Sequence, residues 1–133
     1  MTATHGEATH VEATFEVTKW DESPFDGGVG VAKLTEAMVS KNYSGAIEGT
    51  SQTKWLMAYG PDQTATFVGI ERIRGSVHGK DGSLVLLQSG EFADGAATAS
   101  LRVLSGTDEL KAATGAGTFR ADPQGSVTLD LDL

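Results

Sequence analysis

The chain has 133 residues, enough for one domain with its own core, and it contains no cysteine. Disulfides, thiolate metal sites and a cysteine nucleophile are therefore excluded, which fits a cytoplasmic location. The formal charge of −8 comes from 18 acidic and 10 basic residues spread along the chain, so neither nucleic acid nor an anionic membrane surface is an expected partner.

The N-terminal segment has neither the pattern of a secretory signal nor an apolar run of membrane-spanning length. We expect residues 1–10 to be flexible and residues 11–133 to form a single domain. Residues 11–18 alternate apolar and polar side chains and are the clearest predicted strand. The face expected in the core comprises Val11, Ala13, Phe15 and Val17. The face expected in solvent comprises Glu12, Glu16 and Thr18.

Glycine is abundant, with 17 residues, which indicates many turns and close backbone approaches. Turns are predicted at residues 23–28 and 60–63, and tight hairpins at Asp81-Gly82 and Asp94-Gly95. The remaining runs of strand length are 33–43, 44–50, 52–59, 65–74, 75–79, 83–92, 96–104, 112–120 and 126–132. Residues 31–40 could also form an amphipathic helix, but the β-rich surroundings favour a strand.

Many short antiparallel strands joined by hairpins must stack as a sandwich or close as a barrel, and closure removes exposed edges. We therefore predict an all-β fold consisting of a single closed antiparallel β-barrel of about eight strands. The segments 45–49 and 75–79 share glycines four residues apart around a β-branched residue. We expect these glycines at sharp bends of the sheet, where missing side chains let another backbone approach.

Glu71 is the candidate catalytic residue, because it interrupts an apolar strand face. Alternation along the strand puts Glu71 on the same face as Phe67 and Ile73. The opposite orientation would bury Arg72 and Arg74, which costs more than burying one carboxylate. An inward Glu71 with apolar neighbours is a plausible general acid or base. A Glu71 that only hydrogen-bonds a buried amide would have a structural role.

An apolar binding site is predicted on the same side of the sheet. Alternating aromatic and aliphatic residues with polar tips suit a pocket that grips an apolar molecule. The expected substrate-binding residues are Trp55, Met57, Tyr59, Phe67, Gln88 and Phe92. Gln88 and Tyr59 are the candidate hydrogen-bond partners of Glu71, and Gln88 in particular needs a partner because it is a buried amide. The aromatic residues could equally fill the core of a ligand-free barrel, and no histidine has the spacing of a metal site.

The segments from Tyr43 to Gly49 and from Trp55 to Phe92 resemble DUF3224, a bacterial family of unknown function. Residues 14–21 and 115–119 are similar to its flanking motifs. The family is similar to the allene oxide cyclase barrels, which implies an eight-stranded antiparallel barrel with an apolar cavity for a lipid-like substrate. Many members carry Gln-His where this chain has Leu87-Gln88, so any role of that histidine is lost here or replaced by an amide.

Two functions are compatible with these features. The first is a non-catalytic barrel that binds a small apolar molecule in its cavity. The second is a cofactor-free isomerase or cyclase of the allene oxide cyclase type, with Glu71 as acid or base and with Trp55 and Tyr59 holding the substrate. Neither requires a cofactor or a metal, and a homo-oligomer is compatible with both.

Overall fold

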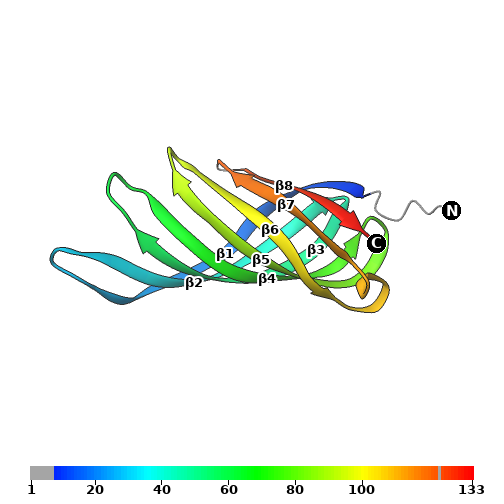
Figure 1. Cartoon of the computed structure of the whole chain (residues 1–133), viewed down its shortest axis with the longest axis horizontal. Coiled ribbons are helices and arrows are strands. Elements are labelled where there is room, and N and C mark those ends of the chain that lie inside the picture. Colours follow the sequence, from blue (N-terminus) through cyan, green and yellow to red (C-terminus); the bar gives the residue numbers. More distant parts are fainter. Residues whose placement is uncertain (1–7, 123) are drawn as a thin grey trace.

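The protein is described by a computed structural model that covers residues 8–122 and 124–133. Eight antiparallel strands form one closed barrel, in which consecutive strands pair and the last strand pairs with the first (Figure 1). The strands are β1 (Thr9–Gly28), β2 (Val31–Gly45), β3 (Ile47–Tyr59), β4 (Ala65–Val77), β5 (Lys80–Ala93), β6 (Ala96–Gly106), β7 (Thr114–Ala121) and β8 (Gly125–Asp132). The predicted all-β barrel is thus confirmed, and the segment 31–40 is strand rather than helix.

One short 3-10 helix, η1 (Asp108–Leu110), lies between β6 and β7. Within the described part of the chain, no helix is long and apolar enough to cross a membrane. The flexibility predicted for residues 1–10 falls mostly on residues 1–7, which lie outside the described residues. β1 already begins at Thr9, two residues before the predicted start of the domain.

β3 and β4 are each continuous, whereas the sequence suggested a break within each of them. Gly49 of β3 lies directly opposite Gly75 of β4. A Cβ atom on Gly49 would lie 2.1 Å from the carbonyl oxygen of Arg74, and one on Gly75 would lie 2.0 Å from that of Glu48. The paired glycines therefore allow the two backbones to approach while both strands continue through the bend.

Two of the four predicted turns are confirmed. Residues 60–63 form a turn, and Asp94-Gly95 is a two-residue loop with φ values of 54° and 78°. Asp81-Gly82 lies inside β5 instead, because the β4–β5 loop is His78-Gly79, with φ values of 51° and 78°. Positive φ at both loop positions is the requirement of a type I′ turn, which a His-Gly pair can also meet.

The turn predicted at residues 23–28 is also wrong, because this segment belongs to β1 and pairs with β2. Register shifts between Pro24 and Asp26, and between Asp26 and Gly28, absorb the turn-forming residues as bulges. The β1–β2 hairpin consequently projects beyond the rest of the barrel, at the end opposite the C-terminus (Figure 1).

The core is the inside of the barrel. Val11, Ala13 and Phe15 are buried as predicted, and the intervening polar residues of β1 are exposed. Val17, predicted to be buried, is 45% exposed. β8 pairs with β1 only as far as Phe15, and a register shift follows directly after Val17, so Val17 lies where the barrel wall opens.

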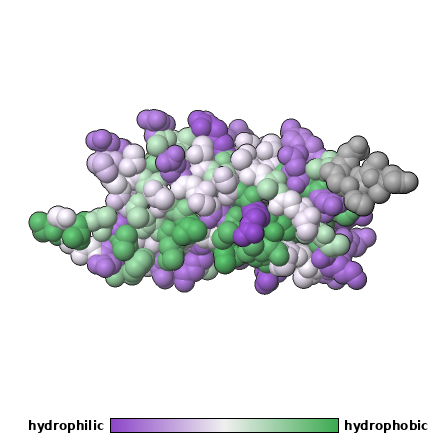
Figure 2. All heavy atoms as spheres, in the orientation of Figure 1, coloured by the Kyte–Doolittle hydropathy of each residue, from purple (hydrophilic) through white to green (hydrophobic). Residues whose placement is uncertain are grey.

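Apolar side chains also lie on the outer surface, where Figure 2 shows hydrophobic patches beside polar ones. The exposed residues on the outside of β2, β3 and β4 are Met38, Leu56, Val68 and Ile70, and those near the tip of the β1–β2 hairpin are Phe25, Val29 and Val31. Nothing in the described chain packs against these residues as a second layer, so the barrel has a single, internal core.

Candidate functional site: an apolar cavity above a buried polar network

An apolar cavity of about 510 Å³ occupies the end of the barrel at which the β1–β2 hairpin projects. Every strand except β2 and β8 contributes to its wall. The lining residues are Phe15, Val17, Trp20, Trp55, Met57, Tyr59, Gln63, Ala65, Phe67, Phe92, Ala97, Phe119 and Ala121. Tyr59 and Gln63 have polar side-chain tips, and both lie near the β3–β4 turn. These polar groups are therefore at the rim of the cavity.

The floor of the cavity is a cluster of buried aromatic rings. The ring centroids of Trp55 and Phe67 are 4.9 Å apart, and Phe119 lies 6.2 Å from each of them. Phe15 meets Phe119 edge to face at 5.7 Å. These distances are those of favourable aromatic pairs, so the floor is a packed and rigid surface.

Lys41 lies directly beneath this floor and is fully buried. Its ammonium nitrogen is 4.5 Å from the centroid of Phe15, 4.9 Å from that of Phe119 and 5.2 Å from that of Trp55. Burial lowers the pKa of Lys41, although the charge of Glu71 and the hydrogen bond to it act in the opposite direction. The rings of the floor thus face the cavity on one side and a buried cation on the other.

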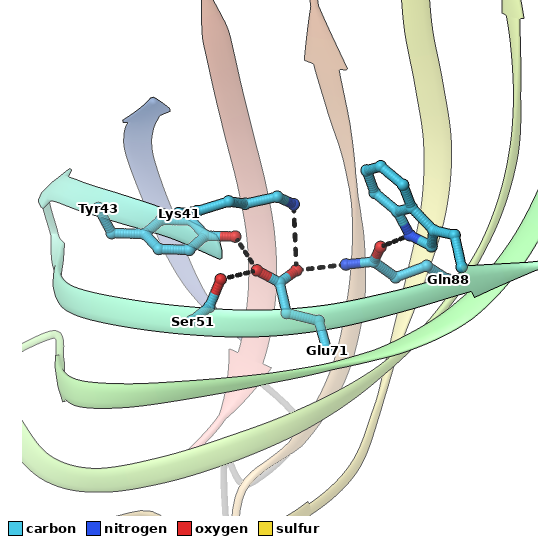
Figure 3. A network of polar contacts seen from close by, with 6 residues as sticks. Lys41, Tyr43, Ser51, Glu71 and Gln88 are labelled. Carbon is cyan, nitrogen blue, oxygen red and sulfur yellow. Dashed lines mark hydrogen bonds and ion pairs between the residues drawn. The ribbon is translucent and has the colours of Figure 1, made fainter. Parts of the chain in front are cut away.

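Glu71 lies deeper still, at the centre of a polar network (Figure 3). One carboxylate oxygen, Oε2, accepts hydrogen bonds from the hydroxyl of Tyr43 at 2.7 Å and from that of Ser51 at 2.6 Å. The other, Oε1, lies 3.5 Å from the ammonium of Lys41 and accepts a hydrogen bond from the amide of Gln88. Of the two predicted partners of Glu71, Gln88 is confirmed, whereas the hydroxyl of Tyr59 donates to Glu22 instead.

Gln88 connects this network to the floor of the cavity. Its side-chain oxygen accepts a hydrogen bond of 2.7 Å from the indole nitrogen of Trp55, while its amide nitrogen donates to Glu71. Burial and the charge of Glu71 raise the pKa of Tyr43 well above its usual value, so this hydroxyl remains a donor. All four partners of Glu71 therefore donate to its carboxylate, and the side chain is 1% exposed.

A second carboxylate, Glu22, lies at the rim of the cavity. It accepts hydrogen bonds from the hydroxyl of Thr35 at 2.6 Å, the indole nitrogen of Trp20 at 3.0 Å and the hydroxyl of Tyr59. Burial alone would raise the pKa of Glu22, but these three bonds and the charge of Lys33 outweigh it and lower the pKa. Burial and the bond to Glu22 raise the pKa of Tyr59 to about 12.

The structure brings most of the predicted substrate-binding residues together. Five of them line the cavity, namely Trp55, Met57, Tyr59, Phe67 and Phe92. Gln88 and the candidate catalytic residue Glu71 lie beneath the floor and do not line it. Whether any of these residues binds a ligand stays a prediction.

Sequence reasoning missed the cation of the buried network and the carboxylate of the rim. Lys41 could have been found from the alternation along β2, since it lies between Val39 and Tyr43 on one apolar face. Glu22 carried no such signal, because a register shift after Val17 reverses which residues of β1 point inward. Among residues 8–122 and 124–133, no group of three or more acidic or histidine side chains is placed to hold a metal ion.

Comparison with known proteins supports the fold and the family. No curated protein matches the chain. It is similar to a solved structure from Shewanella oneidensis, a protein of unknown function from the DUF3224 family, with 27% sequence identity and a TM-score of 0.75 over 94% of this chain and 97% of that one. The likeness to the allene oxide cyclases stays a prediction. Since the model of the family described as "protein of unknown function (DUF3224)" matches residues 11–133, the chain belongs to the DUF3224 family.

Proposed function

We propose that this protein binds a small apolar molecule in the cavity at the open end of the barrel. The cavity itself carries the proposal, because about 510 Å³ lies between aromatic and aliphatic side chains. Ligand sites in proteins have volumes of roughly 300–1,000 Å³ and are lined mainly by apolar and aromatic groups. A barrel of eight strands is wide enough to hold one such ligand.

The network beneath the floor supports a cavity that persists without ligand. Glu71 of β4 is linked to β2 through Lys41 and Tyr43, to β3 through Ser51 and to β5 through Gln88. Four neighbouring strands are thereby held in register under the aromatic rings. A pre-formed site binds more tightly, because little ordering remains to be done when the ligand enters.

The contacts of Glu71 favour the structural role over the catalytic one. A general acid or base must come within hydrogen-bond reach of the reacting atoms. Glu71 is enclosed by four donors and does not line the cavity, whereas the rings of Trp55 and Phe119 do and cover its partner Lys41, so a substrate in the cavity would meet the rings first. The isomerase or cyclase alternative would therefore need an opening of the floor that the binding function does not need.

The two tryptophans provide a direct assay, because both line the cavity. We would titrate the protein with N-phenyl-1-naphthylamine, an uncharged probe whose emission rises in apolar surroundings. We expect saturable binding, with quenching of tryptophan emission and energy transfer to the probe. The absence of saturable binding would contradict the proposal.

A pair of variants locates the binding. Ala121→Phe places a ring inside the cavity, where Ala121 is part of the lining, and should reduce probe affinity at least about tenfold. Ala58→Phe is the matched control, because Ala58 is exposed on the outside of β3 at a similar height. Equal loss of binding in both variants would mean that the probe binds elsewhere.

A further inference from the structure

The rim of the cavity carries hydrogen-bond acceptors next to an apolar interior. We propose that Glu22 and Tyr59 bind a hydrogen-bond donor on the ligand, so that the ligand is an apolar alcohol or amine with its polar group at the rim. This inference rests on the proposed function and adds the chemical class of the ligand to it.

Glu22 faces the inside of the barrel because of the bulge in β1. Val17 pairs with Lys41, and after the register shift Trp20 pairs with Val39 and Glu22 with Ala37. Both of these β2 partners are fully buried inside the barrel. The inward-facing residues of β1 therefore change from odd to even numbers, and Glu22 is brought beside the cavity wall.

The hydrogen bonds to Glu22 engage the donors of Trp20 and Tyr59. The indole nitrogen of Trp20 and the hydroxyl hydrogen of Tyr59 both point to Glu22, and both residues line the cavity. The oxygen of Tyr59 and the carboxylate of Glu22 keep lone pairs that can accept a further bond. A ligand group that reaches them must therefore donate, as a hydroxyl or an ammonium does and a carboxylate does not.

The charges along the cavity point the same way. The cation of Lys41 lies beneath the aromatic floor, and the carboxylate of Glu22 lies at the opposite, open end. Lys33 is the cation that approaches the rim, where its ammonium lies 4.5 Å from the ring centroid of Tyr59. Neither Lys33 nor Glu22 lines the cavity directly, but Lys33 is exposed, whereas Glu22 is half-buried and accepts hydrogen bonds from the lining residues Trp20 and Tyr59.

Three probes with the same ring test the inference: 1-naphthylmethylamine (an ammonium at neutral pH), 1-naphthalenemethanol and the carboxylate 1-naphthaleneacetate. Calorimetric titration at neutral pH and low salt should give the tightest binding for the ammonium probe, weaker binding for the alcohol, and binding at least about tenfold weaker than the ammonium for the carboxylate. If the carboxylate binds as tightly as the ammonium, the inference is wrong while binding in the cavity stands. If these three probes and N-phenyl-1-naphthylamine all fail to bind, the proposed function is itself overturned.

The variant Glu22→Gln keeps the shape of the side chain and removes its charge. We expect it to abolish the preference for the ammonium over the alcohol, leaving the two affinities within about threefold. Glu48→Gln is the control, since Glu48 is exposed near the other end of β3 and the variant has the same net charge. An unchanged preference in Glu22→Gln, or an equal loss in Glu48→Gln, would overturn the inference.

A measurement on the unmodified protein covers the case in which Glu22→Gln does not fold. Raising the salt concentration from about 20 to about 500 mM shortens the Debye length and so screens the charge of Glu22 from the ligand. Binding of the ammonium probe should weaken severalfold, and binding of the alcohol should be unchanged. Binding of the ammonium probe that is insensitive to salt would contradict a charge at the rim.

Discussion

The ammonium of Lys41 lies 3.5 Å from the carboxylate of Glu71 in the interior of the barrel, where both side chains are essentially inaccessible to solvent. Thirty residues separate them in the sequence, and they belong to strands that are not neighbours in the barrel. Each charge depends on the other, because an isolated buried charge has a large desolvation cost. Removal of either member of the pair should therefore be strongly destabilising.

Lys41→Met should destabilise the protein by about 3–5 kcal/mol, because it leaves the carboxylate of Glu71 buried without its cation. The free energy of unfolding, from urea titration followed by circular dichroism, measures the loss. Lys54→Met is the control: its ion pair with Glu36 joins β2 to β3 at the surface, so the loss there should stay below about 1 kcal/mol. Similar losses in the two variants would show that the buried pair is not special.

Gln88→Leu should cost about 1–3 kcal/mol, because it leaves the indole nitrogen of Trp55 without a partner and leaves Oε1 of Glu71 with the ammonium of Lys41 alone. Gln88→His should cost less, since a neutral imidazole has one donor and one acceptor nitrogen, as this position requires. Thermal unfolding of both variants compares them. A histidine variant less stable than the leucine variant would contradict the role assigned to the amide.

The barrel could be predicted from the sequence because alternation and hairpin residues are local signals. The inward orientation of Glu71 could be predicted from the desolvation cost of the alternative, which would have buried Arg72 and Arg74. Both arginines are exposed in the structure. The same parity argument placed Trp55 and Phe67 in the cavity wall. These inferences needed no knowledge of which strands come together.

The rest depended on irregularities and on distant contacts. A bulge changes the parity of a strand without a reliable residue signature, so Glu22 was not recognised at all. Val17 keeps the inward parity and lines the cavity, and its exposure results from the open end of the barrel, which alternation does not predict. The pairing of Lys41 with Glu71 depends on the registers of β2 and β4 with the strand between them, β3, which alternation within one strand does not determine. Glycines such as Gly49 indicate a bend but not whether the strand continues beyond it.

Gly49→Ala should destabilise the barrel by at least about 1–3 kcal/mol, for two reasons. The φ angle of Gly49 is 142°, a value that other residues rarely adopt, and the new Cβ atom would lie 2.1 Å from the carbonyl oxygen of Arg74. Gly27→Ala is the control, because the nearest atom to its Cβ would be 3.6 Å away, an ordinary contact. Chemical denaturation of both variants should show a clear loss for Gly49→Ala alone, and comparable stabilities would mean that β3 and β4 are not packed backbone to backbone at this point.

The two tyrosines should titrate abnormally, and they are the only two in the chain. Burial raises the pKa of Tyr43 well above its usual value and that of Tyr59 to about 12. A tyrosine whose pKa is raised in the folded state contributes stability that is complete below its unfolded pKa, near 10, and is lost as the pH rises toward the folded value. The protein should therefore become less stable above pH 10.

Absorbance at 295 nm, which reports tyrosinate, measures this directly. The native protein should show no step near pH 10, a step near pH 12 from Tyr59, and further ionisation of Tyr43 only on unfolding, whereas protein in urea should show both ionisations near pH 10. In Tyr59→Phe the native step near pH 12 should disappear, which assigns it. A native step near pH 10 that persists in Tyr59→Phe would mean that Tyr43 is not enclosed with Glu71, and the buried network would have to be abandoned.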